Sequence, residues 1–294
     1  MKKAEEYMHK YAEYLHKEKQ ANIEDITGED LEYSARTTAD SAAGMDQWAP
    51  GDLAMLSKKA YERLAKMLNM IEDGSPWPEQ LEKARATFLA KDPDNALDPL
   101  AYRVILMLPS TYRMWAKARL RHLQPWIAGW SMEEMYAGVE GRGAGDAAYS
   151  TAVLLEWCKL HGEEYTGGAA DIYKCFDQIL RPLLFKILHE AGMPEKALSP
   201  YRRFLDVLQV HNTVAGGIGE AYGRPTSIPQ GDPMSMMVVA LLLRPWLIQM
   251  KGMGMQPRIL ADDLQVISTG SRHLEHFEYA YSKTHEHLED MRVA

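Results

Sequence analysis

Hydrophobic and polar positions follow one pattern up to about residue 95 and a different pattern beyond it. In the first part, apolar side chains recur at helical spacing within residues 4–19 (AEEYMHKYAEYLHKEK) and 52–71 (DLAMLSKKAYERLAKMLNMI). This spacing predicts two amphipathic helices in a helical N-terminal region. Gly51 and Asp52 are expected to lie in the N-terminal cap of the second helix.

Beyond residue 95, short strand-like runs are interleaved with helical ones. Strands are predicted at 101–108 (AYRVILML), around 167–173 (GGAADIY) and at 259–267 (ILADDLQVI), and the Gly-rich residues 213–231 suggest a hairpin or loop. Helices are predicted at 110–125, 146–162 (capped by Asp146 and ended by Gly162), 180–191 and 200–211, from Pro233, and from Ser271. Because strands and helices do not alternate strictly, we expect an α+β fold rather than a doubly wound α/β fold.

The longest apolar stretch, residues 234–250, is interrupted by Arg244 and Pro245. It is short for a membrane span, so we interpret it as a buried helix and expect no membrane partner. The two cysteines, Cys158 and Cys175, match no zinc-binding spacing and offer no disulfide framework. A reducing compartment, intracellular and either nuclear or cytoplasmic, is the expected location.

Composition is that of a globular protein: 46% of the 294 residues are apolar and 25% are charged. The formal net charge of −8 weighs against a nucleic-acid-binding protein, since such proteins usually carry a basic surplus. A local concentration of basic residues would outweigh that argument. Arg103, Arg113, Lys117, Arg119 and Arg121 provide one, because the stretch that contains them has no acidic residue.

Three segments carry candidate chemistry. Asp262 and Asp263 lie inside an apolar, strand-like run, where an ionised carboxylate is costly unless it is paired, binds a metal or lies in a turn. Asp171 lies in ADIYKCFD, and residues 227–235 (SIPQGDPMS) form a loop broken by Pro and Gly. Taken separately, these segments can be a hairpin tip, a turn and a helix entry; together they supply carboxylates from two distant segments.

The order of these segments resembles the core of reverse transcriptases, most closely those of non-LTR retrotransposons and more distantly those of group II introns. The matching motifs are Asp171 with Phe176, then Pro229-Gln230-Gly231, then Ala261-Asp262-Asp263. Upstream, YRVILMLPSTYRMWAKARLRHL resembles the fingers segment, and Tyr136-Ala137-Gly138 with the helix after Asp146 resembles the segment that follows it. The resemblance covers roughly residues 98–290.

The resemblance implies a right-hand polymerase fold, with fingers and a ferredoxin-like antiparallel palm sheet flanked by helices. The expected division is a helical N-terminal extension over 1–95, fingers over 96–168 and palm over 169–294. The family's remaining palm segment and its thumb have no counterpart before Ala294. The resemblance therefore implies a domain truncated after the catalytic hairpin.

The implied activity is RNA-templated DNA synthesis within a retroelement, in which dNTPs are added to a DNA or RNA primer on an RNA template. Such nucleotidyl transfer uses two Mg²⁺ ions about 3.5–4 Å apart, and Mn²⁺ is an alternative. Mg²⁺ prefers oxygen ligands, so Asp171 and Asp262 are expected to bridge the ions. Asp263 is expected to be an outer or transient ligand, and the resemblance adds the carbonyl of Ile172.

By the same resemblance, the ring of Phe176 is a steric gate against a 2′-hydroxyl, which favours DNA synthesis over RNA synthesis. Nucleotide-binding roles are expected for Arg103, Arg113, Gln230 and Gly231, because Arg can hold phosphate oxygens with two hydrogen bonds and Gly lets the backbone approach closely. Nucleic-acid-binding roles along the template backbone are expected for Lys117, Arg119 and Arg121. The alternatives are a core Phe, a solvated helix face, and a catalytically inactive polymerase-fold module that binds nucleic acid or protein.

Overall fold

The computed structural model describes residues 2–38, 40–91, 93–95, 97–98, 101–214 and 216–292. They form two compact units, each assembled from segments that are far apart in the sequence. The first unit comprises Met1–Gln20, Gln124–Met193 and Met236–Ala294, and the second comprises Ala21–Leu123 and Pro194–Ser235. The units divide after residues 20, 123, 193 and 235, whereas the predicted boundaries lie after residues 95 and 168. The α+β class is confirmed, since both units combine helices with a sheet.

The first unit contains a three-stranded antiparallel sheet in the order β3-β7-β6. Its strands are β3 (Tyr165–Asp171), β6 (Gln256–Leu260) and β7 (Asp263–Thr269). Its helices are α1 (Lys2–Lys10), α6 (Gln124–Trp130), α7 (Ala144–His161), α8 (Cys175–Gln178), α9 (Arg181–Glu190), α11 (Ser235–Gly252) and α12 (His273–Met291). These strands and helices include the predicted hairpin at 259–267 and the predicted helices that follow Leu180, Pro233 and Ser271.

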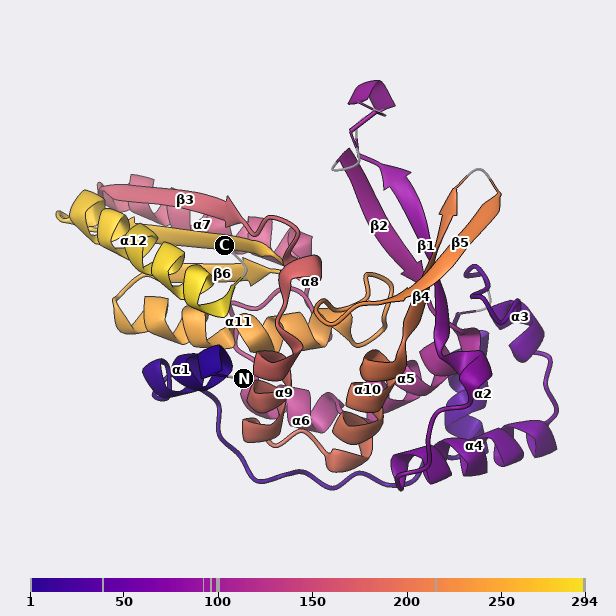
Figure 1. The fold of residues 1–294 in the computed structure, drawn as a ribbon. Coiled ribbons are helices and arrows are strands. Elements are labelled where there is room, and N and C mark those ends of the chain that lie inside the picture. The colour runs from indigo at the N-terminus through magenta and orange to yellow at the C-terminus, as the bar shows by residue number, and fades with distance from the viewer. Residues whose placement is uncertain are drawn as a thin grey trace. The chain divides into compact units, whose positions relative to one another are not determined.

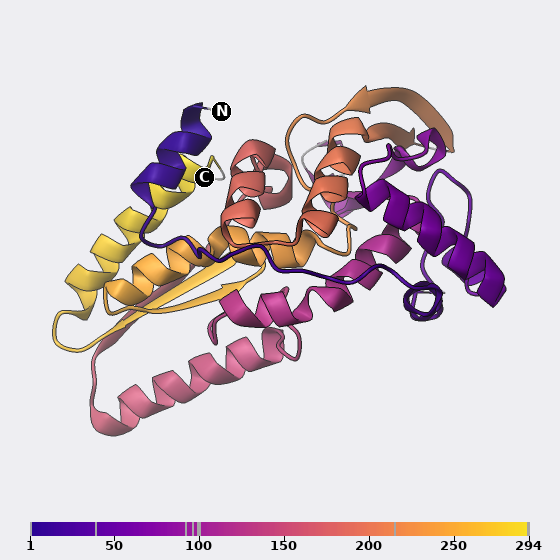
Figure 2. The ribbon, with the colours of Figure 1, turned by 90° about the horizontal axis from the view of Figure 1, so that it is seen from below.

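Helices cover both faces of this sheet because successive strand side chains point to opposite faces. Gly168 lies opposite Val266, and a Cβ atom at Gly168 would come within 2.9 Å of the Phe277 ring of α12. On the other face, the hydroxyl of Thr151 in α7 donates to Gln265 Oε1 at 2.8 Å. Figures 1 and 2 show α12 lying along the sheet.

Two predictions for helices of this unit have clear outcomes. Helix α7 ends at Gly162 as expected, with φ at +68°. Its N-terminal cap is Gly143, however, and Asp146 lies three residues further on, where its carboxylate accepts a hydrogen bond from Gly143 N at 2.8 Å. The apolar helix α11 is buried, with Trp246 and Leu243 inaccessible to solvent. Among the described residues, no helix is long and apolar enough to cross a membrane.

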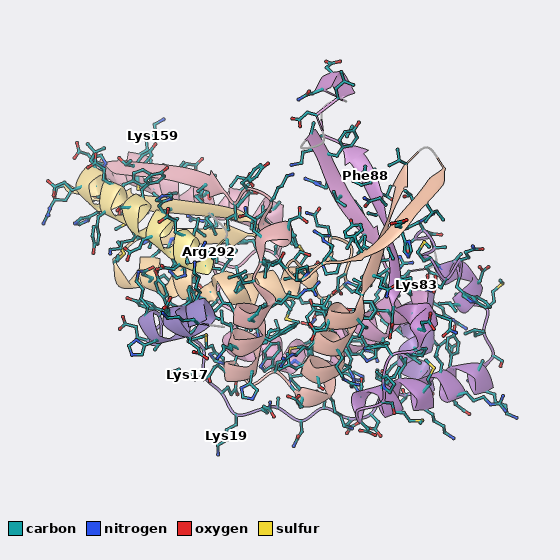
Figure 3. The ribbon with its side chains drawn as sticks, viewed as in Figure 1. Lys17, Lys19, Lys83, Phe88, Lys159 and Arg292 are labelled. Carbon is teal, nitrogen blue, oxygen red and sulfur yellow. The ribbon has the colours of Figure 1, made fainter. Side chains whose placement is uncertain are left out.

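The second unit contains a four-stranded mixed sheet in the order β2-β1-β4-β5, in which only β1 and β4 run parallel. Its strands are β1 (Lys83–Ala90), β2 (Tyr102–Met107), β4 (Gln209–Val214) and β5 (Gly217–Gly223). Its helices are α2 (Gly28–Arg36), α3 (Pro50–Leu53), α4 (Lys58–Glu72), α5 (Ser110–His122) and α10 (Glu195–Val207), with short 3₁₀ turns at Glu79–Leu81 and Pro93–Asn95. Figure 3 labels Lys83 and Phe88 toward opposite ends of β1.

The structure corrects two predictions for the N-terminal region. Residues 83–90, expected to lie in a helical region, form β1, because Ala84 and Ala86 alternate into the core and the strand pairs with both β2 and β4. Gly51 and Asp52 belong to the short helix α3 instead of capping α4. The cap of α4 is Ser57, whose side chain accepts a hydrogen bond from Ala60 N.

Candidate active site

The hairpin between β6 and β7 presents Asp262 at its tip. Leu260 pairs with Asp263, so Ala261 and Asp262 form a two-residue turn. Ala261 has a φ of +57°, in the left-handed region that costs an L-residue with a Cβ roughly 1–2 kcal/mol. Backbone strain of this kind persists only where the surrounding structure enforces it. Here the two ladders on β7 hold the turn, and the turn sets the position of Asp262.

Asp171 lies at the end of β3, directly beside this turn. In the β3–β7 ladder Asp171 is the partner of Asp263, and the next residue, Ile172, donates its N–H to the carbonyl of Asp262 at 3.1 Å. The structure therefore brings together the two sequence-distant acid segments, as the motif order predicted. Asp171 and Asp263 are exposed, whereas Asp262 is half-buried.

Cys175, at the start of α8, is a neighbour of this acid pair that sequence reasoning missed. Its backbone N–H donates to the Ile172 carbonyl at 3.1 Å, and its thiol is buried. Burial, together with the negative charges of Asp262 and Asp171, raises the pKa of this thiol to about 12. Both carboxylates therefore lie close enough to the sulfur to affect its ionisation. No spacing pattern pointed to this position, because it is a lone cysteine beside an acidic motif.

The side chains around this turn provide only part of a metal site. Within the described ranges, no group of three or more His, Cys, Asp or Glu side chains is arranged to hold a metal ion. The acids at the ends of β3 and of the hairpin do fit the usual habit of Mg²⁺, which takes one or two protein carboxylates and completes its shell with substrate phosphates and water. The carbonyl of Ile172 already accepts the Cys175 hydrogen bond and retains a second lone pair.

Phe176 lies in α8, five positions after Asp171, and its side chain is half-buried. The residue that precedes α8 by one position, Lys174, has a φ of +47°, so the chain turns sharply between the end of β3 and Phe176. This turn leads directly from the acid at the end of β3 into the helix that carries Phe176. Its role as a steric gate stays a prediction.

The Pro-Gln-Gly loop belongs to the second unit, where it packs against β2. The Gln230 carbonyl accepts a hydrogen bond from Leu106 N at 2.8 Å. Gly231 has a φ of +118°, and a Cβ atom there would lie 2.7 Å from the Leu106 carbonyl oxygen. The close backbone approach that this glycine permits is therefore an approach to β2. A nucleotide-binding role for Gln230 and Gly231 stays a prediction.

Asp232, directly after this loop, is a second residue that sequence reasoning missed. It is buried, and its carboxylate accepts hydrogen bonds from Tyr112 Oη at 3.1 Å and Met234 N at 3.0 Å. Burial raises the pKa of Asp232 to about 6, against the lowering effect of these hydrogen bonds. The carboxylate ties the loop to α5.

The structure corrects the expected role of Arg119. This side chain is buried, and it forms a salt bridge with Glu72 of α4, in which Arg119 Nε donates to Oε1 at 2.6 Å and Nη2 donates to Oε2. It also donates to the Glu24 carbonyl at 2.7 Å. A guanidinium held in the core in this way is inaccessible to a nucleic-acid backbone, so the structure gives Arg119 a role in the fold.

The other expected cations differ in their exposure and in the hydrogen bonds and ion pairs that they make within the protein. Arg113 donates to the Ala42 carbonyl at 2.6 Å, and burial lowers its pKa. Lys117 donates to the Thr37 carbonyl at 3.1 Å, and burial lowers its pKa as well. Arg121 pairs with Asp30 at 2.6 Å but remains half-exposed, and Arg103 is exposed on β2. Arg103 and Arg121 are therefore the cations of this group that are best exposed to an anionic ligand.

In the comparisons with known proteins, no family model and no curated protein matches this chain.

Proposed function

We propose that the chain is a reverse-transcriptase-type nucleotidyltransferase, which adds dNTPs to a primer on an RNA template. The observation that carries this proposal is the β3–β7–β6 arrangement, in which Asp171 lies beside the turn that presents Asp262. Support also comes from the order of the three motifs and from the antiparallel character of this sheet. The first unit would correspond to the palm, and the second would supply most of the fingers.

In this proposal Asp171 and Asp262 of the first unit would hold divalent ions, with Mg²⁺ as the expected ion and Mn²⁺ as the alternative. Such ions would stabilise negative charge on the attacking and leaving oxygens. Asp263 supports the site from the first position of β7. Phe176 excludes a 2′-hydroxyl, and Arg103 holds phosphate oxygens of the incoming nucleotide.

Primer extension on an RNA template tests the proposal. We expect Asp262→Asn to lower the rate by more than about a hundredfold, since even groups that only support metal ligands contribute about 10–100-fold. Asp206→Asn is the matched control, because Asp206 is exposed on α10 and makes only a 3.8 Å surface ion pair with Arg202. Extension by Asp262→Asn at the rate of this control would refute the assignment.

Phe176 decides which polymer is made. With Phe176→Ala we expect ribonucleotides to be incorporated alongside deoxynucleotides, because the smaller side chain leaves room for the 2′-hydroxyl. If the unaltered chain already preferred ribonucleotides to deoxynucleotides, an RNA-synthesising enzyme would be the better interpretation. An unchanged preference for deoxynucleotides in the variant would remove the gate from the proposal.

A second candidate function is a catalytically inactive polymerase-fold module that binds nucleic acid or a protein. The observation in its favour is that the described acids do not form a three-residue metal cluster. RNA binding without any metal-dependent primer extension would support this candidate.

A further inference from the structure

A groove of about 490 Å³ lies on the second unit, remote in sequence from Asp171 and Asp262. Its lining residues come from the segment around α3, from α4 and from the N-terminal turn of α5. The apolar lining residues are Trp48, Leu53, Leu56, Ala60, Leu64 and Met67. Lys59 and Arg63 line it as well.

Large apolar side chains at this groove are unusually exposed. Trp48 is 52% exposed, and Met55, the neighbour of Leu56, is 78% exposed. Exposed apolar patches with polar rims mark binding surfaces. Trp, Met and Arg are also the residue types enriched in protein–protein interfaces. The composition of this groove therefore favours a protein occupant over a nucleic acid, which would need a row of cations along its phosphates.

The charge of the groove indicates which kind of protein segment would bind there. Lys59 and Arg63 are four residues apart on α4, so they lie on the same helix face, one turn apart. Within the described part of the chain, neither forms an ion pair. Asp52 and Glu62 are nearby acids on these two helices, but neither lines the groove. Two cations beside an apolar floor are complementary to a segment with both apolar and acidic residues.

We propose that this groove is a docking site for an acidic amphipathic helix of a partner protein. Such a helix would place its apolar side chains, spaced at i, i+3, i+4 and i+7, against Leu53, Leu56 and Leu64, as helix-in-groove recognition requires. Its acidic residues would pair with Lys59 and Arg63. Residues 48–67 thereby gain a role that is independent of nucleotidyl transfer.

Fluorescence anisotropy with a synthetic peptide tests this proposal on the full chain. The probe is a fluorescein-labelled helix of about 15 residues, long enough to follow α4, with Leu at i, i+3, i+4 and i+7 and Glu on its outer face. We expect saturable binding of this probe. Weaker binding is expected for a scrambled peptide of the same composition and for a peptide with Lys in place of every Glu.

Matched variants on α4 separate the groove from general electrostatics. K59E/R63E is expected to weaken binding by at least about tenfold, the change that corresponds to 1.4 kcal/mol. K58E/K66E makes the same charge change on the same helix with residues that do not line the groove, so binding is expected to stay within about threefold. Met67→Gln tests the apolar lining in the same way, because Met67 lines the groove. Met70→Gln is its matched control, because Met70 is an exposed residue outside the groove.

Three results would overturn the proposal. They are no binding of the acidic probe, equal losses in K59E/R63E and K58E/K66E, and displacement of the probe by a single-stranded RNA whose binding depends on Lys59 and Arg63. The last result would assign the groove to nucleic acid. Circular dichroism and unfolding curves of each variant confirm that a loss of binding does not reflect a loss of the fold.

Discussion

The predicted site residues of the two units differ in whether their groups already make contacts that stabilise the fold. In the first unit, the acids lie at a strand end and a hairpin tip, and Asp171 and Asp263 are exposed. In the second unit, Arg119 forms a buried ion pair, Arg113 and Lys117 bind backbone carbonyls, and Gly231 packs against β2. The acids of the motif are therefore less engaged by the fold than the local excess of cations, most of which already bind other parts of the protein.

The largest effect is expected at the buried ion pair. Arg119→Ala leaves Glu72 buried without its partner, and breaking a buried pair from one side typically costs about 3–5 kcal/mol of unfolding free energy. Urea denaturation measures this loss. An exposed ion pair contributes less than about 1 kcal/mol. A loss of unfolding free energy in that range would contradict the buried position of Arg119 and would again allow its predicted contact with nucleic acid.

A glycine substitution tests the structural role of the Pro-Gln-Gly loop. Gly231→Ala is expected to cost roughly 2–5 kcal/mol, because a positive φ costs about 1–2 kcal/mol and the clash with the Leu106 carbonyl adds about 1–3 kcal/mol. Gly74→Ala is the control, with a φ of +115° and nothing within 4 Å of the added Cβ. Equal losses of unfolding free energy in the two variants would show that the approach to β2 has no energetic weight.

The pH dependence of stability tests the burial of Asp232. The folded chain has a pKa of about 6 at this carboxyl, whereas the ordinary value is 3.8, so the folded state keeps a proton that the unfolded chain loses between those two pH values. The contribution of Asp232 to the unfolding free energy therefore falls by roughly 2–3 kcal/mol as the pH rises through this window. Asp232→Asn removes this fall. Urea titrations at pH 4 and pH 7 check it, and identical pH slopes in both proteins would contradict it.

The smallest effect is expected at Arg121. This side chain is about half exposed and pairs with Asp30 at 2.6 Å, and exposed pairs contribute about 0–1 kcal/mol. Arg121→Ala should therefore leave stability nearly unchanged. If Arg121 contacts the template, the same variant should weaken RNA binding and reduce the salt slope by about one charge. A large loss of stability would place Arg121 with Arg119 among the structural cations.

Periodicity along the chain predicted most helices after residue 100 and the hairpin at 259–267, because their patterns are local. The helix expected over 200–211 instead ends at Val207, and residues 209–211 belong to β4. Periodicity also missed β1, since Lys83–Ala90 becomes a strand through pairing with β2 and with β4, whose residues lie more than a hundred positions later. The resemblance to reverse transcriptases, and not periodicity, predicted that the two acid segments meet, because the order of the motifs carries that information. The partner of Arg119 could not be predicted, since Glu72 belongs to a different helix and no spacing connects the two.

The central claim is that Asp171 and Asp262 act together at one cation-binding point. Calorimetric titration of the full chain with Mn²⁺ tests it most directly, using Asp171→Asn, Asp262→Asn and the double variant. The account predicts that either single substitution removes most of the binding and that the double substitution removes little more, because residues that share one site are not additive. Unchanged Mn²⁺ binding in either single variant, or no binding by the unaltered chain, would contradict it.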